Sequence, residues 1–229
     1  FINIKYSKMT KKIGFLFLCK DFINKLEIWQ LFFKNNYDKC NIYIHCSKRD
    51  TITQDFLKKY LVEKTIPSEW GNIYPPIKYL QECSFKNNDY KMVLVSESTV
   101  PVKSFDYIYK FLTHNNSSYL NYCPHLVRNK RDIITNKMQY QRFINNMLSD
   151  NKFAYHIDIK HWYFNECWHI LNHYHTGLII KDKIIYQYIK NGFAWDENYP
   201  SYILSMHNEL DNVINSTTTF VNWKEKISN

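Results

Sequence analysis

The amino-acid sequence predicts an α/β fold with a mostly parallel central sheet, and two observations support this prediction. Short apolar segments alternate along the chain with segments of helical spacing, which is typical of repeated strand–helix–strand units. Residues 92–95 form an uninterrupted apolar run, as strands do when both of their faces are covered. Crossover helices cover both faces of a parallel sheet, so the two observations indicate the same architecture.

The N-terminal half carries the clearest alternation. Residues 13–19 form the first predicted strand, and residues 22–33 follow with apolar side chains at the spacing of a helix face. The further elements expected in this half are strand 41–46, helices 53–61 and 75–85, strand 92–95, helix 104–112 and strand 117–123.

The C-terminal half has weaker signals. The polar and basic residues 128–152 are predicted to form a loop and a helix, and Gly192 is predicted to close a helix over residues 183–192 as its C′ residue. The remaining expected elements are a strand at 176–182, a helix at 198–210 and a closing strand at 217–223.

The composition fits one domain that spans residues 1–229. The chain is 45% hydrophobic and 17% aromatic, which is enough to bury a large core, and no Gly- or Pro-rich linker divides it. Its formal charge is +9, but the lysines are dispersed and form no nucleic-acid recognition motif, so we expect no nucleic-acid partner. A basic balance also suits phosphate-bearing substrates such as nucleotide sugars.

The cysteines and the apolar segments bear on the cellular compartment. Six cysteines are scattered without paired spacing, which predicts reduced thiols rather than a zinc site or a disulfide framework. No stretch reaches the roughly 18 to 20 apolar residues that a membrane span needs. We therefore expect no membrane span in this chain and a cytoplasmic location.

A polar cluster follows the predicted strand at residues 92–95. Ser96, Glu97 and Ser98 stand where this strand ends. Open α/β sheets bind their ligands outside the carboxyl ends of the strands, so the cluster is a candidate substrate site. The alternative is structural, with Ser98 or Ser104 capping the helix that follows.

Six segments, in this order, resemble the core-2/I-branching β-1,6-N-acetylglucosaminyltransferase family: "KKIGFLFLCKD…IWQLFF", "YIHCSKR", "EWGNI", "YKMVLVSESTVPVKSFDYIYKFL", "FAWDENYPSYIL" and "NSTTTFVNW". The resemblance implies a Rossmann-like fold of the GT-A type and an inverting transfer of sugar from a nucleotide donor without a divalent metal. The sequence agrees with the last point, because it contains no Asp-x-Asp pair that could bridge a metal to the diphosphate.

The resemblance makes Glu197 the general base. Asp196 and Glu197 directly precede the helix predicted at 198–210, where a carboxylate can accept the proton of an attacking hydroxyl. The residues alone leave a second interpretation open, in which a carboxylate in the first turn of a helix is stabilised by the helix dipole and has no catalytic role.

Donor binding is also implied by the resemblance. The end of the second predicted strand would hold the nucleotide, and basic residues near the C-terminus would neutralise the departing diphosphate. The residues assigned to the donor are His45, Ser47, Lys48, Trp70, Lys224 and Lys226. Lys48, Arg128 or Arg131 are alternatives for the diphosphate contact, and an ordinary semi-buried tryptophan is the alternative for Trp70.

Acceptor binding is assigned by the same resemblance to Glu97, Ser98, Arg142, Gly177, Asp196 and Trp223. A small residue followed by an aromatic strand in the family aligns with either "KHWYFN" or "YHTGLIIKD", and the second alignment places Gly177 at the cleft. For Arg142, a solvated helix face is the alternative.

A cluster of histidines could indicate a metal site. His169, His173 and His175 have a spacing of i, i+4 and i+6, and two histidines four residues apart can share a metal on one helix face. No acidic or cysteine ligand follows at a fixed spacing, so we expect no metal.

Together these observations predict an inverting, metal-independent glycosyltransferase that moves N-acetylglucosamine or a similar sugar from a UDP-sugar to a glycan or glycoprotein. Residues 9–125 would form the nucleotide-sugar-binding half and residues 126–229 the acceptor and catalytic half. The family's usual Golgi anchor is absent, which favours a viral or microbial enzyme of the cytoplasm or host cytoplasm. The alternative is a catalytically inactive GT-A-like module that binds a sugar or nucleotide.

Overall fold

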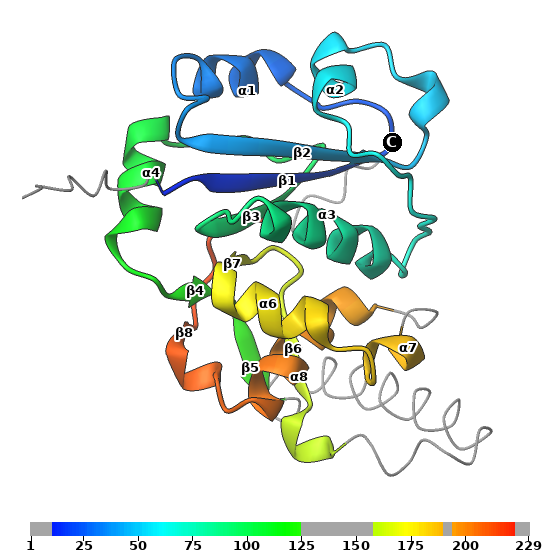
Figure 1. Ribbon diagram of the computed structural model, residues 1–229, viewed down its shortest axis with the longest axis vertical. Helices are drawn as coiled ribbons and strands as arrows, with labels where there is room; N and C mark the ends of the chain where they lie inside the picture. Colours follow the sequence, from blue (N-terminus) through cyan, green and yellow to red (C-terminus); the bar gives the residue numbers. More distant parts are fainter. Residues whose placement is uncertain (1–10, 125–157, 190–193, 223–229) are drawn as a thin grey trace, which may run out of the picture.

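The structure is a computed structural model that describes residues 11–124, 158–189 and 194–222 (Figure 1). The described part contains a six-stranded sheet of order β2-β1-β3-β7-β4-β8 and a two-stranded sheet of β5 and β6. The strands are β1 (Ile13–Cys19), β2 (Cys40–Cys46), β3 (Lys91–Ser96), β4 (Ser118–Tyr119), β5 (Tyr122–Pro124), β6 (Tyr163–Asn165), β7 (Ile170–Asn172) and β8 (Val213–Ile214). The helices are α1 (Leu26–Phe33), α2 (Asp55–Tyr60), α3 (Tyr74–Lys86), α4 (Phe105–His114), α6 (His173–Lys181), α7 (Tyr186–Ile189) and α8 (Tyr199–Met206).

The central sheet is mixed but mostly parallel, which confirms the predicted fold class. Strand β1 pairs in parallel with both β2 and β3, and β4 pairs in parallel with β8. Strand β7 is the exception, because it runs antiparallel to both β3 and β4. The long parallel strands β1, β2 and β3 therefore end at the same edge of the sheet.

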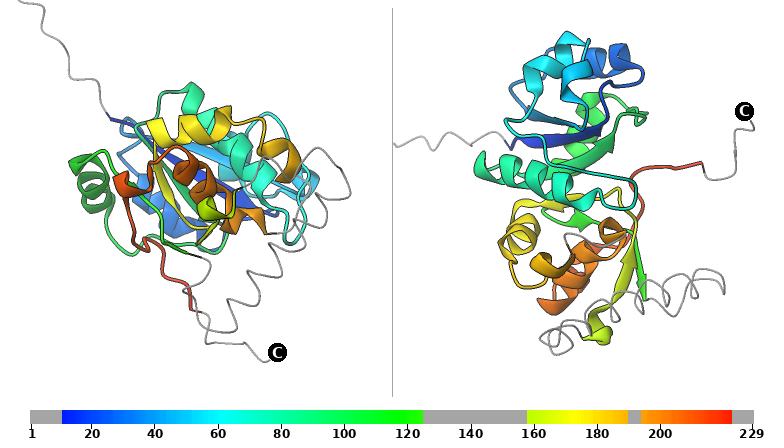
Figure 2. Two further views of the ribbon diagram at one scale, coloured as in Figure 1. Left: turned by 90° about the horizontal axis from the view of Figure 1, so that it is seen from below. Right: turned by 90° about the vertical axis from the view of Figure 1, so that its right-hand side faces the viewer.

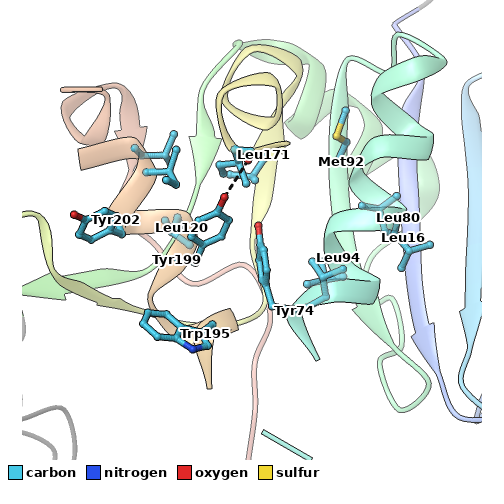
Figure 3. Packing of buried hydrophobic residues seen from close by; sticks show 14 of the residues in the cluster. Leu16, Tyr74, Leu80, Met92, Leu94, Leu120, Leu171, Trp195, Tyr199 and Tyr202 are labelled. Atoms are coloured by element: carbon cyan, nitrogen blue, oxygen red, sulfur yellow. Dashed lines mark hydrogen bonds between the residues drawn. The ribbon is translucent and has the colours of Figure 1, made fainter. Parts of the chain in front are cut away.

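Helices cover both faces of the sheet, as the uninterrupted apolar strands predict. Side chains alternate along β1, so that Phe15 and Phe17 belong to a core cluster with α1, α2 and α4, whereas Leu16 belongs to a second core cluster with α3, α6 and α8. Figures 1 and 2 show α3 between the N-terminal strands and the helices α6 and α8. Figure 3 shows Tyr74 of α3 and Tyr199 of α8 in this second core, where their ring centroids are 4.8 Å apart.

Two predicted strands of the C-terminal half are wrong. Residues 176–182 belong mostly to helix α6, which begins after Asn172, whose side chain accepts a capping hydrogen bond from the His175 N–H at 2.7 Å. The closing strand is β8 and not residues 217–223, of which residues 217–222 are described and form no strand. There the polar side chains take the hydrogen bonds, as when Thr217 Oγ1 donates to Glu166 at 2.9 Å.

The other elements agree with the prediction in kind and differ in extent. Helix α1 begins at Leu26 rather than at residue 22, and the strand predicted at 117–123 is divided into the short strands β4 and β5. Helix α8 lies within the predicted helix 198–210, and α7 covers residues 186–189 of the helix predicted at 183–192, of which residues 183–189 are described. The loop and helix predicted at 128–152 and the cap at Gly192 lie outside the described residues. Among the described helices, none has the length and apolar character of a membrane span.

Lys91 is a fully buried lysine at the start of β3. Its Nζ donates to Asn115 Oδ1 at 3.2 Å and lies 4.9 Å from the centre of the Tyr119 ring. Burial, with a smaller contribution from the charge of Lys11, lowers the pKa of Lys91 to about 8. In an unfolded chain a lysine has a pKa of about 10.4.

We therefore expect Lys91 to make the folded state more stable as the pH rises from about 8 to about 10, because the unfolded chain binds more protons in this window. Urea denaturation at about pH 7.5 and about pH 9.5 measures the effect, and Lys91→Met should largely remove the rise. Equal pH dependence of the free energy of unfolding in Lys91→Met and the wild type would contradict this expectation.

Candidate active site

The carboxyl ends of β1, β2 and β3 form the first part of the candidate site. Cys19 lies opposite Cys46 in the parallel register, and Leu18 lies opposite Ser96. The pairing of β1 and β2 extends beyond the strands, because the Lys48 N–H donates to the Lys20 carbonyl at 2.8 Å. The three loops that follow these strands are therefore neighbours, as expected for a ligand site of an open α/β sheet.

Glu97 and Ser98 connect the loop after β3 to the loop after β1. The Glu97 carboxylate accepts from the Lys20 N–H at 2.6 Å, and the Glu97 carbonyl accepts from the Asn24 N–H at 2.8 Å. Ser98 Oγ accepts from the Asn24 side-chain amide at 3.2 Å. Ser104, not Ser98, caps helix α4 by accepting from the Tyr107 N–H. The cluster therefore shapes the edge of the site, and acceptor binding by Glu97 and Ser98 stays a prediction.

The end of β2 presents residues with very different exposure. Ser47 and Lys48 are exposed, whereas His45 is fully buried and its Nε2 accepts from the Ile66 N–H at 2.9 Å. Burial lowers the pKa of His45 below its ordinary value, so the ring is neutral near pH 7. His45 thus anchors the chain that follows α2, while Ser47 and Lys48 are accessible to a ligand.

A second part of the candidate site lies where the turn at residues 69–72 meets the residues before α8. Gly71 has a positive φ of 78° in this turn, and its carbonyl accepts a hydrogen bond from the Ala194 N–H. Trp70 is 87% exposed. The structure therefore brings the turn that carries Trp70 to the segment that carries Glu197, two regions that the sequence separates by more than a hundred residues.

The two neighbouring carboxylates, Asp196 and Glu197, have different surroundings. Both lie on a single 3₁₀ turn, Trp195–Glu197, which Trp195 fixes by packing on Trp162 with ring centroids 5.3 Å apart. Asp196 is buried, and burial raises the pKa of its carboxyl, although hydrogen bonds from its own backbone N–H and from Cys167 oppose this shift. Glu197 is only partly buried. Of the two, Glu197 is the more accessible carboxylate.

Gly177 lies in helix α6, where it faces α3. A Cβ atom at this position would lie 3.0 Å from the ring of Phe85. The glycine therefore allows the two helices to approach closely. Of the two alignments left open by the sequence, "KHWYFN" is the one that contains a strand, β6.

The histidines of the C-terminal half take part in separate contacts. His169 contacts Gln81, His173 stacks on Phe85, and His175 contacts Ser118 and Glu209. In residues 11–124, 158–189 and 194–222, no group of three or more His, Cys, Asp or Glu side chains could hold a metal ion.

Lys20 is an exposed residue of the candidate site that the sequence prediction did not include. It directly follows β1, and its carbonyl and N–H bind the loops after β2 and β3. The strand-end rule that selected Ser96, Glu97 and Ser98 would also have selected Lys20 had it been applied to β1. Four predicted site residues, Arg142, Trp223, Lys224 and Lys226, lie outside the described residues, as do Arg128 and Arg131.

A mostly parallel sheet with exposed polar residues at its strand ends is typical of α/β enzymes. The family comparison makes the class specific, because the model of the Core-2/I-Branching enzyme family, named Branch, matches residues 13–229. The chain is therefore a glycosyltransferase, and it belongs to the Core-2/I-branching enzyme family. No curated protein matches it.

Proposed function

We propose that this chain transfers a sugar from a UDP-sugar to a hydroxyl of a glycan or glycoprotein, with inversion at the anomeric carbon. N-acetylglucosamine is the first candidate for the sugar, because the family is one of branching N-acetylglucosaminyltransferases. The observation that carries the proposal is the partly buried Glu197, which is held next to the turn of Trp70.

In the proposed reaction, Glu197 accepts the proton of the acceptor hydroxyl as its oxygen attacks the anomeric carbon. The bond between that carbon and the diphosphate oxygen breaks on the opposite face, and UDP leaves with the bonding electron pair. Cationic side chains stabilise the negative charge that develops on the diphosphate. Lys48 is exposed at the end of β2 and is available for this role. Lys224 and Lys226 remain proposed for it from the family resemblance.

The remaining assignments follow the two parts of the candidate site. We propose that the donor lies at the carboxyl end of β2 and contacts Ser47, Lys48 and Trp70. The buried His45 would support this site by holding the chain that follows α2. Glu97 and Ser98 would line the acceptor side. Asp196 was also assigned to the acceptor from the sequence, but its side chain is buried, so we propose that it contributes to the stability of the turn rather than to acceptor binding. Arg142 and Trp223 stay assigned to the acceptor on the family resemblance alone. The assignment of Gly177 to the acceptor is not kept, because Gly177 is buried in α6 against Phe85.

We predict that UDP release from the donor is unchanged by EDTA, because the sequence has no Asp-x-Asp pair and enzymes of this family act without a metal. The assay follows UDP release with a panel of UDP-sugars and a glycan acceptor, with and without the chelator. Loss of activity in EDTA and its recovery with Mn²⁺ would overturn metal independence. UDP binding without turnover of any donor would instead favour the inactive binding module.

A further inference from the structure

Asn165, the last residue of β6, is fully buried, and its side-chain amide is hydrogen-bonded at both its nitrogen and its oxygen. Its Nδ2 donates to the carbonyl oxygens of Asp196 at 2.9 Å and Glu166 at 3.1 Å. Its Oδ1 accepts from the Ser201 backbone N–H at 3.1 Å. The Ser201 Oγ lies 2.8 Å from the same Oδ1, and its single proton can be donated there or to the Tyr163 or Asn198 carbonyl. Both N–H donors of the amide and its oxygen are therefore hydrogen-bonded, which fixes the orientation of this side chain.

These hydrogen bonds hold both ends of the segment that contains Glu197. Asp196 directly precedes Glu197, and Ser201 lies in the first turn of α8. The first N–H groups of a helix have no acceptor within the helix, and Asn198 at the N-cap position makes no capping hydrogen bond with its side chain. Asn165 supplies the missing acceptor from strand β6, and in doing so fixes the start of α8.

Two further contacts hold the same segment. The Asn198 side-chain amide donates to the Tyr163 carbonyl of β6 at 3.0 Å. Before Glu197, the Ala194 N–H donates to the Gly71 carbonyl, and Ala194 has a positive φ of 58°. Strand β6 and the turn at residues 69–72 thus both form hydrogen bonds with the segment around Glu197. The Asn165 side chain binds the residue before Glu197, Asp196, and a residue after it, Ser201.

We propose that Asn165 is a positioning residue of the transfer reaction, which acts by fixing the backbone on either side of the general base. This inference rests on the proposed role of Glu197. A general base must lie within hydrogen-bond distance of the hydroxyl that it deprotonates, and a displacement of about 1 Å can lower a rate by about 10²-fold. The contacts of Asn165 restrict such a displacement.

The test compares Asn165→Ala with Ser201→Ala. Both remove buried hydrogen bonds from the same network, but only Asn165→Ala releases the Asp196 carbonyl. We expect kcat to fall by about 10- to 10²-fold in Asn165→Ala and to stay within about two-fold of the wild type in Ser201→Ala. The affinity for UDP, measured by calorimetry, should be unchanged in both variants.

Hydrogen exchange provides a readout that does not depend on activity. Amides of residues 194–201 should exchange faster in Asn165→Ala than in Ser201→Ala. A kcat of Asn165→Ala that falls no further than that of Ser201→Ala would overturn the proposal, as would equal exchange rates. If Asn165→Ala does not fold, Asn165→Ser takes its place, because a serine side chain is too short to reach the Asp196 carbonyl.

A double-mutant cycle separates this inference from the proposed function. If Asn165 acts through Glu197, adding Asn165→Ala to Glu197→Gln should cause no further fall in kcat. A full additional loss in the double variant would show that Asn165 has only a structural role, which overturns the inference. Near wild-type transfer in Glu197→Gln alone would instead overturn the role of Glu197, and it would do so whatever the hydrogen exchange of residues 194–201 shows.

Discussion

Replacement of Glu197 by glutamine is expected to lower the rate of sugar transfer by about 10²- to 10⁴-fold. Glutamine keeps the shape of the side chain and much of its hydrogen bonding, but it cannot accept the proton of the acceptor hydroxyl. Donor affinity should barely change, because the general base faces the acceptor. The measurement is transfer by purified, folded protein, with the melting temperature and UDP affinity determined on the same sample.

Asp196→Asn is the matched control for this prediction. Asp196 adjoins Glu197, but it is buried, and burial raises the pKa of its carboxyl toward the neutral form. Asparagine keeps the shape of the side chain, and its amide oxygen can still accept a hydrogen bond, so we expect a loss of about 1 kcal/mol in stability and little loss in rate. Near wild-type transfer in Glu197→Gln would refute the assignment, and Glu97 would then be the next carboxylate to test.

The N-terminal half of the fold could be predicted because its strands are long and buried on both faces. Strand β1 has seven residues with an apolar pattern that the sequence shows directly. In contrast, β4 and β8 have two residues each. They are stabilised as strands by pairing with each other and by the pairing of β4 with β7. Strands of this length leave no periodic pattern, so their positions depend on tertiary contacts.

Helix α6 shows how a local pattern can mislead. The segment "TGLII" has the composition of a buried strand, yet it is helical in the structure. The capping residue Asn172 and the packing of Gly177 on Phe85 outweigh the strand propensity. Asparagine is a preferred N-cap residue, so Asn172 was a signal in the sequence that a helix starts there.

Part of the candidate site could be predicted from the sequence, either by the strand-end rule or by the family resemblance. The strand-end rule selected Glu97, and it would also have selected Lys20. Ser47 and Lys48 were assigned from the family resemblance. Asn165 was not predictable in this way, because its partners Asp196 and Ser201 are 31 and 36 residues away along the chain. Its role depends on the tertiary structure, which places β6 beside the start of α8.

A second large effect is expected at Gly14, the second residue of strand β1. A Cβ atom at this position would overlap Ser84 Oγ and would lie 2.6 Å from Asp89 Oδ2. Asp89 is fully buried, and its carboxylate accepts from Asn41 at 2.6 Å, from Tyr43 at 2.8 Å and from the Ser84 hydroxyl. Gly14 therefore leaves the space in which this buried carboxylate keeps its hydrogen-bond donors.

We expect Gly14→Ala to destabilise the protein by about 2 to 4 kcal/mol, because the added methyl group must displace Asp89 or Ser84 and break hydrogen bonds to a buried carboxylate. For a chain of this size the melting temperature should fall by about 5 to 15 °C. Backbone entropy alone would give the opposite sign, since a change from glycine to alanine in a compatible conformation is normally stabilising.

Gly177→Ala is the matched control, because it adds the same methyl group in helix α6. Its Cβ would lie 3.0 Å from the Phe85 ring, which must shift slightly, while alanine favours the helix by about 1 kcal/mol over glycine. These two effects oppose each other, so Gly177→Ala should stay within about 1 kcal/mol of the wild type. Chemical denaturation of both variants measures the difference, and a Gly14→Ala protein as stable as the wild type would show that the space around Asp89 is not required.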